Sequence, residues 1–244
     1  MSPSFPFPRC RRVHLSALAA LAATLIGGAA QAQLVYLGPV DLNGTGLGAV
    51  STLLTIQSPA NGSFESGAVG LSIINEQLVT GDAKIGTSQT QLRSLGEVGI
   101  DSAADLRIVF NAVEPGNGAN GLVLSELVLK IFSADGDTLF TSGAFASQSF
   151  ADTFTGTGKS GFLFGLSEAD AAAAQQAAFF GDFSDNRIGL FAAAEGATGG
   201  PETFFVAEAV GLPPVAAIPE PGTWALLGFG LIGLMLRRGR SRDE

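Results

Sequence analysis

Short apolar or alternating runs recur along the middle of the chain, and turn residues such as Asn-Gly, Pro-Gly and Asp-Gly separate them. The runs lie at 34–40, 50–57, 69–75, 106–113, 122–132, 138–145, 161–166, 187–193 and 203–209. Runs of this length and spacing are typical of the strands of an all-β sandwich. The pattern therefore predicts a single all-β domain, a β-sandwich of the jelly-roll or immunoglobulin-like kind.

Two of these runs form the clearest predicted hairpin, because 122–132 and 138–145 are joined by a five-residue turn with two aspartates and a glycine. Strict alternation in the first arm divides its side chains between two faces. One face would carry Val123, Ser125, Leu127, Leu129 and Ile131, and the other would carry Leu124, Glu126, Val128 and Lys130.

One segment has the pattern of a helix instead. Ser167 can cap it, Glu168 and Asp170 favour its positive end, and an alanine-rich run follows to Ala178. We expect one short helix inserted among the strands. Three phenylalanines follow it and are expected to attach its end to the sandwich: Phe179, Phe180 and Phe183.

The first 32 residues have the pattern of a secretory signal peptide. Arg9, Arg11 and Arg12 precede an apolar stretch at 15–28, which is too short for a comfortable membrane span. Ala30 and Ala32 then form a small-x-small cleavage site, so the mature chain would begin at Gln33. The Sec machinery and signal peptidase are the expected partners, and twin-arginine export is the alternative.

At the other end of the chain, three features follow one another. Ile218-Pro219-Glu220-Pro221 precedes an apolar stretch at 222–236, which includes Trp224, and an arginine cluster at 237–242 closes the series. Fifteen residues make a helix of roughly 22 Å, which is marginal for a hydrocarbon core of about 30 Å. The pattern predicts a transmembrane helix held briefly in the inner membrane, and an ordinary single-pass anchor is the alternative.

This tail resembles the PEP-CTERM sorting signal of Gram-negative bacteria, which is also described as an ice-binding-protein C-terminal domain. The residues that carry the resemblance are Pro219, Glu220, Pro221, Trp224, Arg237, Arg238, Arg240 and Arg242. The resemblance implies recognition by an exosortase, cleavage near the motif, and release to the cell surface or the extracellular polymer matrix. It implies a sorting tail and not an ice-binding surface.

With both ends set aside, the chain divides into a signal peptide (1–32), an acidic ectodomain (33–211), a Pro/Ala-rich linker (212–218) and the sorting tail (219–244). The single Cys, His and Trp all fall within the two end segments. The ectodomain therefore lacks the residues for disulfides, for Cys or His catalysis, and for Cys- or His-ligated zinc. With six basic and nineteen acidic residues, the stretch 33–217 has a net charge of −13, which argues against binding nucleic acid.

Carboxylates are the remaining chemical material. Two pairs in glycine-containing turns, Asp135 with Asp137 and Asp182 with Asp185, are candidate calcium ligands, although a simple polar turn explains each pair as well. No other cofactor is expected. The fifteen phenylalanines of the stretch 33–217, beside one Tyr and no Trp, argue against an aromatic sugar-binding stripe, because Phe has no polar group.

Taken together, the sequence predicts an exported surface or matrix protein without enzymatic activity, a structural or adhesive module associated with exopolysaccharide. Two alternatives belong to other classes. One is a secreted hydrolase acting on polysaccharide, which would need two converging carboxylates. The other is a calcium- or carbohydrate-binding module.

Overall fold

The computed structural model describes residues 33–40, 47–58, 62–86, 88–112, 121–150, 161–197 and 199–209. All of them belong to one compact unit, Gln31–Ile218. The signal helix expected within 1–32 and the transmembrane helix expected at 222–236 lie outside the described residues. Among the helices of the described part, none has the length and apolar character needed to span a bilayer.

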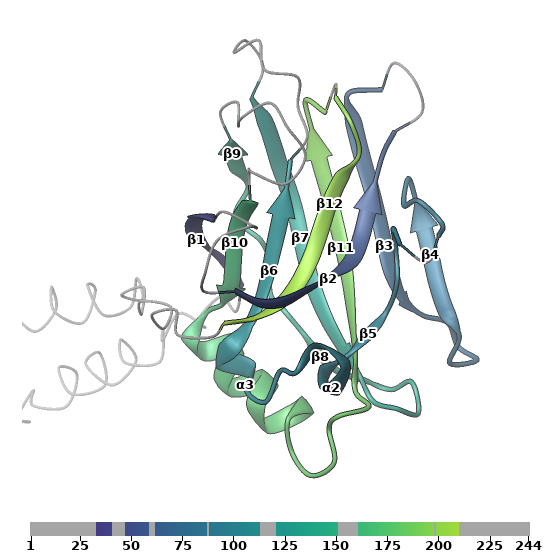
Figure 1. Cartoon of the computed structure of the whole chain (residues 1–244), viewed down its shortest axis with the longest axis vertical. Helices are drawn as coiled ribbons and strands as arrows, with labels where there is room; N and C mark the ends of the chain where they lie inside the picture. Colours follow the sequence, from purple (N-terminus) through teal and green to yellow (C-terminus); the bar gives the residue numbers. More distant parts are fainter. Residues whose placement is uncertain are drawn as a thin grey trace, which may run out of the picture. The chain divides into compact units, whose positions relative to one another are not determined.

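The described strands form two antiparallel sheets (Figure 1). The five-stranded sheet has the order β1 (Leu34–Val40), β10 (Gly161–Leu166), β6 (Leu106–Asn111), β12 (Glu202–Ala209) and β2 (Leu47–Ile56). The seven-stranded sheet has the path β4 (Gln77–Gly81), β3 (Phe64–Leu71), β11 (Arg187–Glu195), β7 (Leu122–Phe132) and β8 (Thr138–Thr141). Two short strands complete it: β5 (Arg93–Ser94) pairs with β11, and β9 (Gln148–Phe150) pairs with β7.

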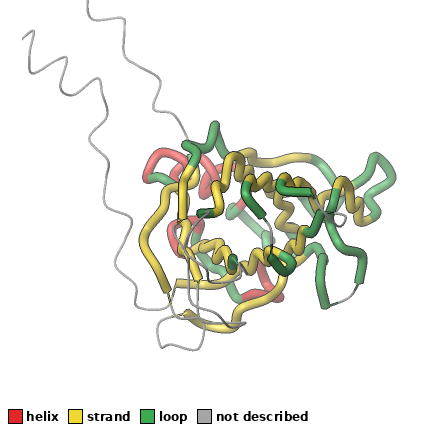
Figure 2. The backbone as a smooth tube through the Cα atoms, turned by 90° about the horizontal axis from the view of Figure 1, so that it is seen from above, coloured by secondary structure: helices red, strands yellow, loops and turns green. Residues whose placement is uncertain are grey.

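The chain crosses repeatedly from one sheet to the other. It passes from β2 to β3, from β6 to β7 and from β10 through β11 to β12, and each step changes the sheet. The resulting orders, β2-β12-β6-β10 and β3-β11-β7-β8, are those of a jelly roll and not of an immunoglobulin fold. The all-β prediction is thus confirmed, with the jelly-roll alternative as the topology. Figure 2 shows how little of the described chain is helical.

The inner faces of both sheets meet in one apolar core. Phe110 of β6 stacks on Phe204 of β12, with 4.7 Å between ring centroids. Phe150 of β9 belongs to the other sheet, yet the centroid of its ring lies 4.0 Å from the ring centroid of Phe162 in β10. Aromatic rings from both sheets therefore interlock, which explains the use of Phe as a core residue.

Helix α3 (Glu168–Ala178) begins and ends where the sequence predicts it. The Ser167 side chain accepts a hydrogen bond from the backbone N–H of Asp170 at 3.2 Å, which satisfies one of the free N–H groups of the first turn. Phe179 is buried in the core and Phe183 packs against the core, as expected, with 5.3 Å between the centroids of the two rings. The expectation for Phe180 is wrong, because this side chain is 88% exposed.

The alternation predicted for β7 is wrong in its first part. Glu126 pairs with Ala193 and Leu124 pairs with Ala194, so Ser125 is an extra residue that forms a β-bulge. The bulge shifts the phase of the strand, and Leu124 is buried in the core with Leu127. Glu126 and Lys130 are exposed and Val128 is half-buried, so these three share a face as predicted.

Several short elements follow patterns too polar or too brief to predict from periodicity: β4, β5, β9, the helix α2 (Leu95–Val98) and the 3-10 helix η2 (Ala103–Asp105). The apolar run at 69–75 is displaced in the structure. Its strand, β3, ends at Leu71, because a turn begins at Ser72. The backbone N–H of Ser72 donates to the carbonyl of Glu76, and the hydroxyl of Ser72 accepts from the backbone N–H of Glu76.

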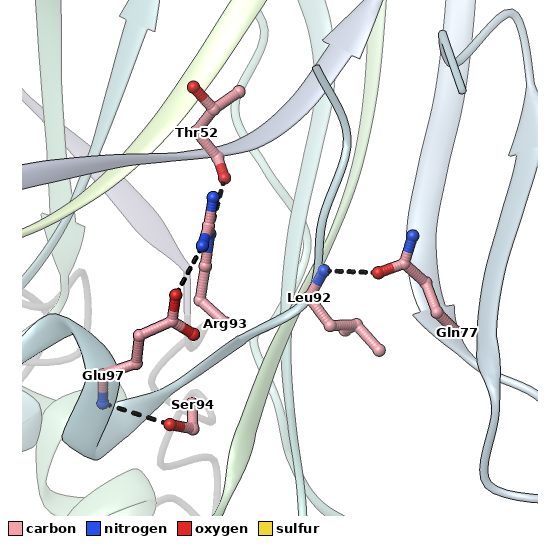
Figure 3. A network of polar contacts seen from close by, with 6 residues as sticks. All are labelled: Thr52, Gln77, Leu92, Arg93, Ser94 and Glu97. Carbon is pink, nitrogen blue, oxygen red and sulfur yellow. Dashed lines mark hydrogen bonds and ion pairs between the residues drawn. The ribbon is translucent and has the colours of Figure 1, made fainter. Parts of the chain in front are cut away.

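The segment between β4 and α2 joins the two sheets at one side (Figure 3). Its Leu92 N–H donates to the Oε1 atom of Gln77 in β4 at 2.9 Å. Arg93 donates from Nε to the carbonyl of Thr52 in β2 at 3.1 Å and pairs with Glu97 through NH1. Ala83 and Leu92 of this segment pack against the apolar core.

Candidate functional site

A hollow of about 270 Å³ opens on the outer face of the seven-stranded sheet. Strands β3, β4, β7, β8 and β11 all contribute to it. Its lining residues are Ala68, Val69, Gly70, Leu71, Leu78, Thr80, Lys130, Phe132, Thr138, Leu190 and Phe191. Because ligand pockets measure about 300–1,000 Å³, this hollow suits a group the size of one ring.

Strand register brings two glycines together next to the hollow. Lys130 of β7 lies beside Gly189 of β11, and Gly70 of β3 lies beside Leu78 of β4. Gly189 and Gly70 are themselves close neighbours, since a Cβ atom on Gly189 would lie 3.4 Å from the Cα atom of Gly70. Two adjacent strands thus lack side chains at the same level, and larger residues stand on either side.

Phe132 takes the space that these glycines leave. A Cβ atom on Gly189 would come within 2.7 Å of its Cε2 atom, and one on Gly70 would lie 3.6 Å from its Cζ atom. The ring therefore lies over both glycines and is only 7% exposed, although it sits on the outer face of the sheet. This ring and the half-buried Phe191 give the hollow an aromatic surface.

The polar groups of the hollow stand at its margin. Lys130 is exposed, as are Thr80 and Thr138. Lys130 is the single charged residue among the described lining residues, and no carboxylate belongs to that set. The site can therefore offer apolar contact, one cation and two hydroxyls to a ligand.

A hydrogen-bonded junction lies beside the hollow. Arg187, which pairs with Phe132 across β11 and β7, donates from NH1 to Oδ1 of Asn75 at 3.0 Å. Asn75 in turn donates from Nδ2 to the carbonyl of Ala134 at 2.9 Å. The junction holds the β3–β4 turn against the β7–β8 turn and so fixes the two walls of the hollow relative to each other.

Four ionisable side chains of the described part are buried away from the hollow: Glu65, Arg107, Asp170 and Glu202. Burial raises the pKa of Asp170 in α3 to about 6, and the backbone N–H of Gly143 offsets part of that rise. Burial lowers the pKa of Arg107, and the charge of Asp105 opposes that change. Arg107 donates from NH1 to the carbonyls of Ala104 and Leu106, at 2.6 and 3.0 Å.

The candidate calcium ligands lie in exposed turns. Asp135 and Asp137 belong to the β7–β8 turn, and Asp182 and Asp185 follow α3. The hydroxyl of Ser184 donates to Oδ1 of Asp182 at 3.1 Å. In the described part of the chain, no three His, Cys, Asp or Glu side chains come together as a set that could hold a metal ion. Calcium binding therefore stays a prediction.

Of the predicted processing residues, Ala30 and Ala32 lie outside the described residues. Gln33 is described, and its carbonyl accepts a hydrogen bond from the N–H of Ser167 at 3.1 Å, one residue before β1 begins. The predicted mature start therefore contacts the residue that caps α3.

The sorting residues also lie outside the described residues: Pro219, Glu220, Pro221, Trp224, Arg237, Arg238, Arg240 and Arg242. Comparison with known protein families matches residues 217–240 to the PEP-CTERM protein-sorting motif. The match includes each of these residues except Arg242, which lies two positions beyond it. No curated protein and no solved structure matches the chain.

The motif confirms the resemblance drawn from the tail. It implies an exported protein that an exosortase processes at the membrane and that reaches the cell surface. The hollow, in contrast, was not predicted from the sequence. The sequence offers one indication of it, the glycines Gly70 and Gly189, each of which lies inside an apolar run. Glycine weakens a strand, so its presence there often marks the close approach of another group.

Proposed function

We propose that this protein is a structural or adhesive module of the extracellular matrix and that it contacts exopolysaccharide through the hollow on its seven-stranded sheet. The sorting motif at 217–240 supports the destination. The observation that carries the contact is the hollow lined by the rings of Phe132 and Phe191. Matrix polysaccharide is the polymer that a protein with this destination meets.

The chemistry of the hollow fits a sugar ring. The C–H face of a pyranose is apolar and can pack on one aromatic ring, here Phe191, while neighbouring side chains supply the polar contacts that a phenylalanine lacks. The hydroxyls of Thr80 and Thr138 can donate to or accept from ring hydroxyls, and Lys130 can donate to a hydroxyl or a uronate carboxylate. One such contact is weak, and binding to a long polymer strengthens when several copies engage it together.

The composition of the hollow does not favour the hydrolase alternative. Glycoside hydrolysis uses two carboxyl groups about 5–9.5 Å apart on either side of the scissile bond. The described lining of the hollow offers Lys130 and no carboxylate. We therefore propose a binding role and no catalytic step for this site.

The test is affinity electrophoresis of the exported, processed protein through gels containing the exopolysaccharide of the producing cells. Phe191→Ala removes the exposed part of the aromatic surface, and Phe180→Ala removes an exposed phenylalanine located after α3. We expect the polymer to retard the unmodified protein and Phe180→Ala, and retardation to fall several-fold for Phe191→Ala. Equal retardation of both variants would contradict the assignment of the hollow, and no retardation of any form would contradict the polysaccharide contact.

A further inference from the structure

Two cationic side chains lie on the outer face of the seven-stranded sheet, the face that carries the hollow. Lys130 projects there from β7, because Leu129 and Ile131 on either side of it point into the core. Arg187 projects there from β11, because the residue after it, Ile188, points into the core. The outer face next to the hollow therefore carries two positive charges.

Of the basic residues in the described part, these two stand apart from the others. Arg93 forms an ion pair with Glu97, the one such pair among the described residues. Lys84 donates to a side-chain amide oxygen, and Arg107 is only 1% exposed. Lys130, in contrast, is exposed, and none of the described carboxylates forms an ion pair with it.

The hydrogen bonds of Arg187 leave its charge in place. Its guanidinium donates to the side-chain oxygen and the carbonyl of Asn75, and to the carbonyl of Ala134. All three acceptors are neutral groups. The guanidinium is therefore positioned at the edge of the hollow without being neutralised.

The carboxylates nearest to Lys130 along its own strand and the following turn are too distant to neutralise it. Glu126 stands four residues away on the same face of β7, and Asp137 lies at the level of Ser133, three residues in the other direction. Each residue of a strand spans about 3.3 Å, so these backbone separations are about 10–13 Å. The Debye length is about 10 Å at 0.1 M salt, so these charges are largely screened from the ammonium of Lys130. An anion in direct contact with Lys130 would not be screened in this way.

Strand register places Lys130 between the aromatic surface of the hollow and Arg187. Lys130 lies opposite Gly189, so Arg187 and Phe191, two residues before and after Gly189, are its diagonal neighbours. Diagonal neighbours on one face of an antiparallel pair lie about 7–8 Å apart, within reach of aromatic and long side chains. A ring that packs on Phe191 therefore has the ammonium of Lys130 within reach of its edge.

We propose that the hollow selects an acidic polysaccharide, with Lys130 binding the carboxylate of a uronic acid whose ring packs on Phe191. The inference rests on the proposed contact with exopolysaccharide and adds the class of sugar. The carboxylate of a uronic acid is a substituent of the ring, at the position where a neutral hexose carries a hydroxymethyl group. Hydrogen bonds between an ammonium and a carboxylate are roughly twice as strong as neutral ones, so Lys130 favours the acid over the neutral sugar. Arg187 adds a second positive charge beside the same position.

The charge of the whole ectodomain restricts where such a polymer can bind. The stretch 33–217 carries a net charge of −13, and a field of this sign repels a polyanion. Contact with an acidic polymer therefore requires a surface on which cations are not already paired with carboxylates. Lys130 and Arg187 supply that surface next to the hollow.

The test compares the exopolysaccharide of the producing cells with the same polymer after its carboxyl groups have been reduced to alcohols. Affinity electrophoresis of the exported, processed protein through gels that contain either polymer gives an apparent dissociation constant for each. We expect reduction of the polymer to weaken binding about two- to fivefold, the effect of one exposed ion pair. Lys130→Gln removes the charge, keeps a hydrogen-bonding group and leaves the core untouched, and it should bind both polymers equally. Lys84→Gln, the same substitution in the loop after β4, is the matched control and should keep the preference for the native polymer.

The outcomes separate this inference from the proposed function. Equal binding of the native and the reduced polymer by the unmodified protein would overturn the selection of an acidic sugar and leave the polysaccharide contact standing. A preference that persists in Lys130→Gln, or that Lys84→Gln loses to the same extent, would overturn the role of Lys130. Failure of every form to bind the native polymer would contradict the polysaccharide contact itself, and this inference with it.

Discussion

The guanidinium of Arg187 donates to Oδ1 of Asn75 at 3.0 Å across 112 residues of sequence. Asn75 has a positive φ of 59° and turns the chain between β3 and β4, while Arg187 begins β11. The same asparagine donates to the carbonyl of Ala134 in the β7–β8 turn. Two hairpins and a central strand are thereby joined at one end of the hollow.

This relationship predicts that Arg187→Ala and Asn75→Gly destabilise the protein by similar amounts, about 1–2 kcal/mol each. Glycine tolerates the left-handed backbone at position 75, so Asn75→Gly removes the side-chain bonds without straining the turn and adds only the entropic cost of a glycine in the unfolded chain. The free energies of unfolding should be measured by urea denaturation for both variants and for the double variant. We expect the double variant to lose clearly less than the sum of the single losses, because one interaction is removed twice. Simple additivity would show that the two side chains act independently.

The close packing of Phe132 on Gly189 gives a second prediction. The Cβ atom of Gly189→Ala would lie 2.7 Å from Cε2 of Phe132 and 2.8 Å from the carbonyl oxygen of Val69. The ring must move, so we expect a loss of about 1–3 kcal/mol in the free energy of unfolding. Gly86→Ala is the control, since its Cβ would have no neighbour closer than 3.5 Å.

A second change separates the two contacts of that added methyl group. Phe132→Leu shortens the side chain over Gly189, so combining it with Gly189→Ala should recover part of the lost stability. No recovery in the double variant would place the strain at the backbone of Val69 instead of the ring.

Comparison of sequence and structure shows where periodicity succeeds and where it fails. The helix at 168–178 was predictable to the residue, because Ser167 caps it and its alanines have strong helix propensity. Strands β1 and β10 likewise match their predicted bounds, since each is one short apolar run. The jelly-roll order was one of two alternatives, since short strands of even spacing suit both topologies.

The failures have local physical causes. A single bulge at Ser125 reverses the faces of the first part of β7, and no alternation rule can detect one extra residue. Strand β4 has only five residues, and only Val79 among them is half-buried, because the strand lies at the sheet border. The hollow has Phe132 in its lining, and this ring packs on Gly70 and Gly189, which are neighbours across two strands; that proximity comes from strand pairing and not from the sequence.

Asp170 predicts a pH dependence of stability. Burial raises the pKa of its carboxyl group to about 6 in the folded protein, from an ordinary value of 3.8. The folded state therefore binds the proton more tightly than the unfolded state, and this group's contribution to stability is complete below about pH 4. The contribution is lost as the pH rises through about 6. Asp170→Asn should make the protein more stable at pH 7, by about 1–3 kcal/mol.

The measurement is the difference in the free energy of unfolding between the unmodified protein and Asp170→Asn from pH 3.5 to 7.5. The difference should be small at the acid end and grow toward pH 7. Glu168→Gln is the matched control, because Glu168 stands exposed in the same first turn of α3. A difference that stays constant with pH would show that the carboxyl group of Asp170 titrates alike in both states.

The aspartate turns predict a response to calcium. If Asp135 with Asp137, or Asp182 with Asp185, binds the ion, millimolar calcium should raise the melting temperature and EDTA should reverse the rise. Asp135→Asn with Asp137→Asn, and separately Asp182→Asn with Asp185→Asn, identify the turn responsible. A melting temperature that responds to neither calcium nor EDTA would remove calcium from both turns.

The sorting motif gives the last prediction. Replacing Pro219, Glu220 and Pro221 by alanine removes the recognition sequence and leaves the apolar stretch at 222–236 and the arginines after it in place. We expect the uncleaved precursor to accumulate in the membrane fraction of an exosortase-carrying host, detected by immunoblotting and by the intact C-terminus in mass spectrometry. Pro213→Ala with Pro214→Ala in the preceding linker is the control and should be processed normally. If the motif variant is released with the same C-terminus as the unmodified protein, these three residues do not direct sorting, and the destination must be encoded elsewhere in the chain.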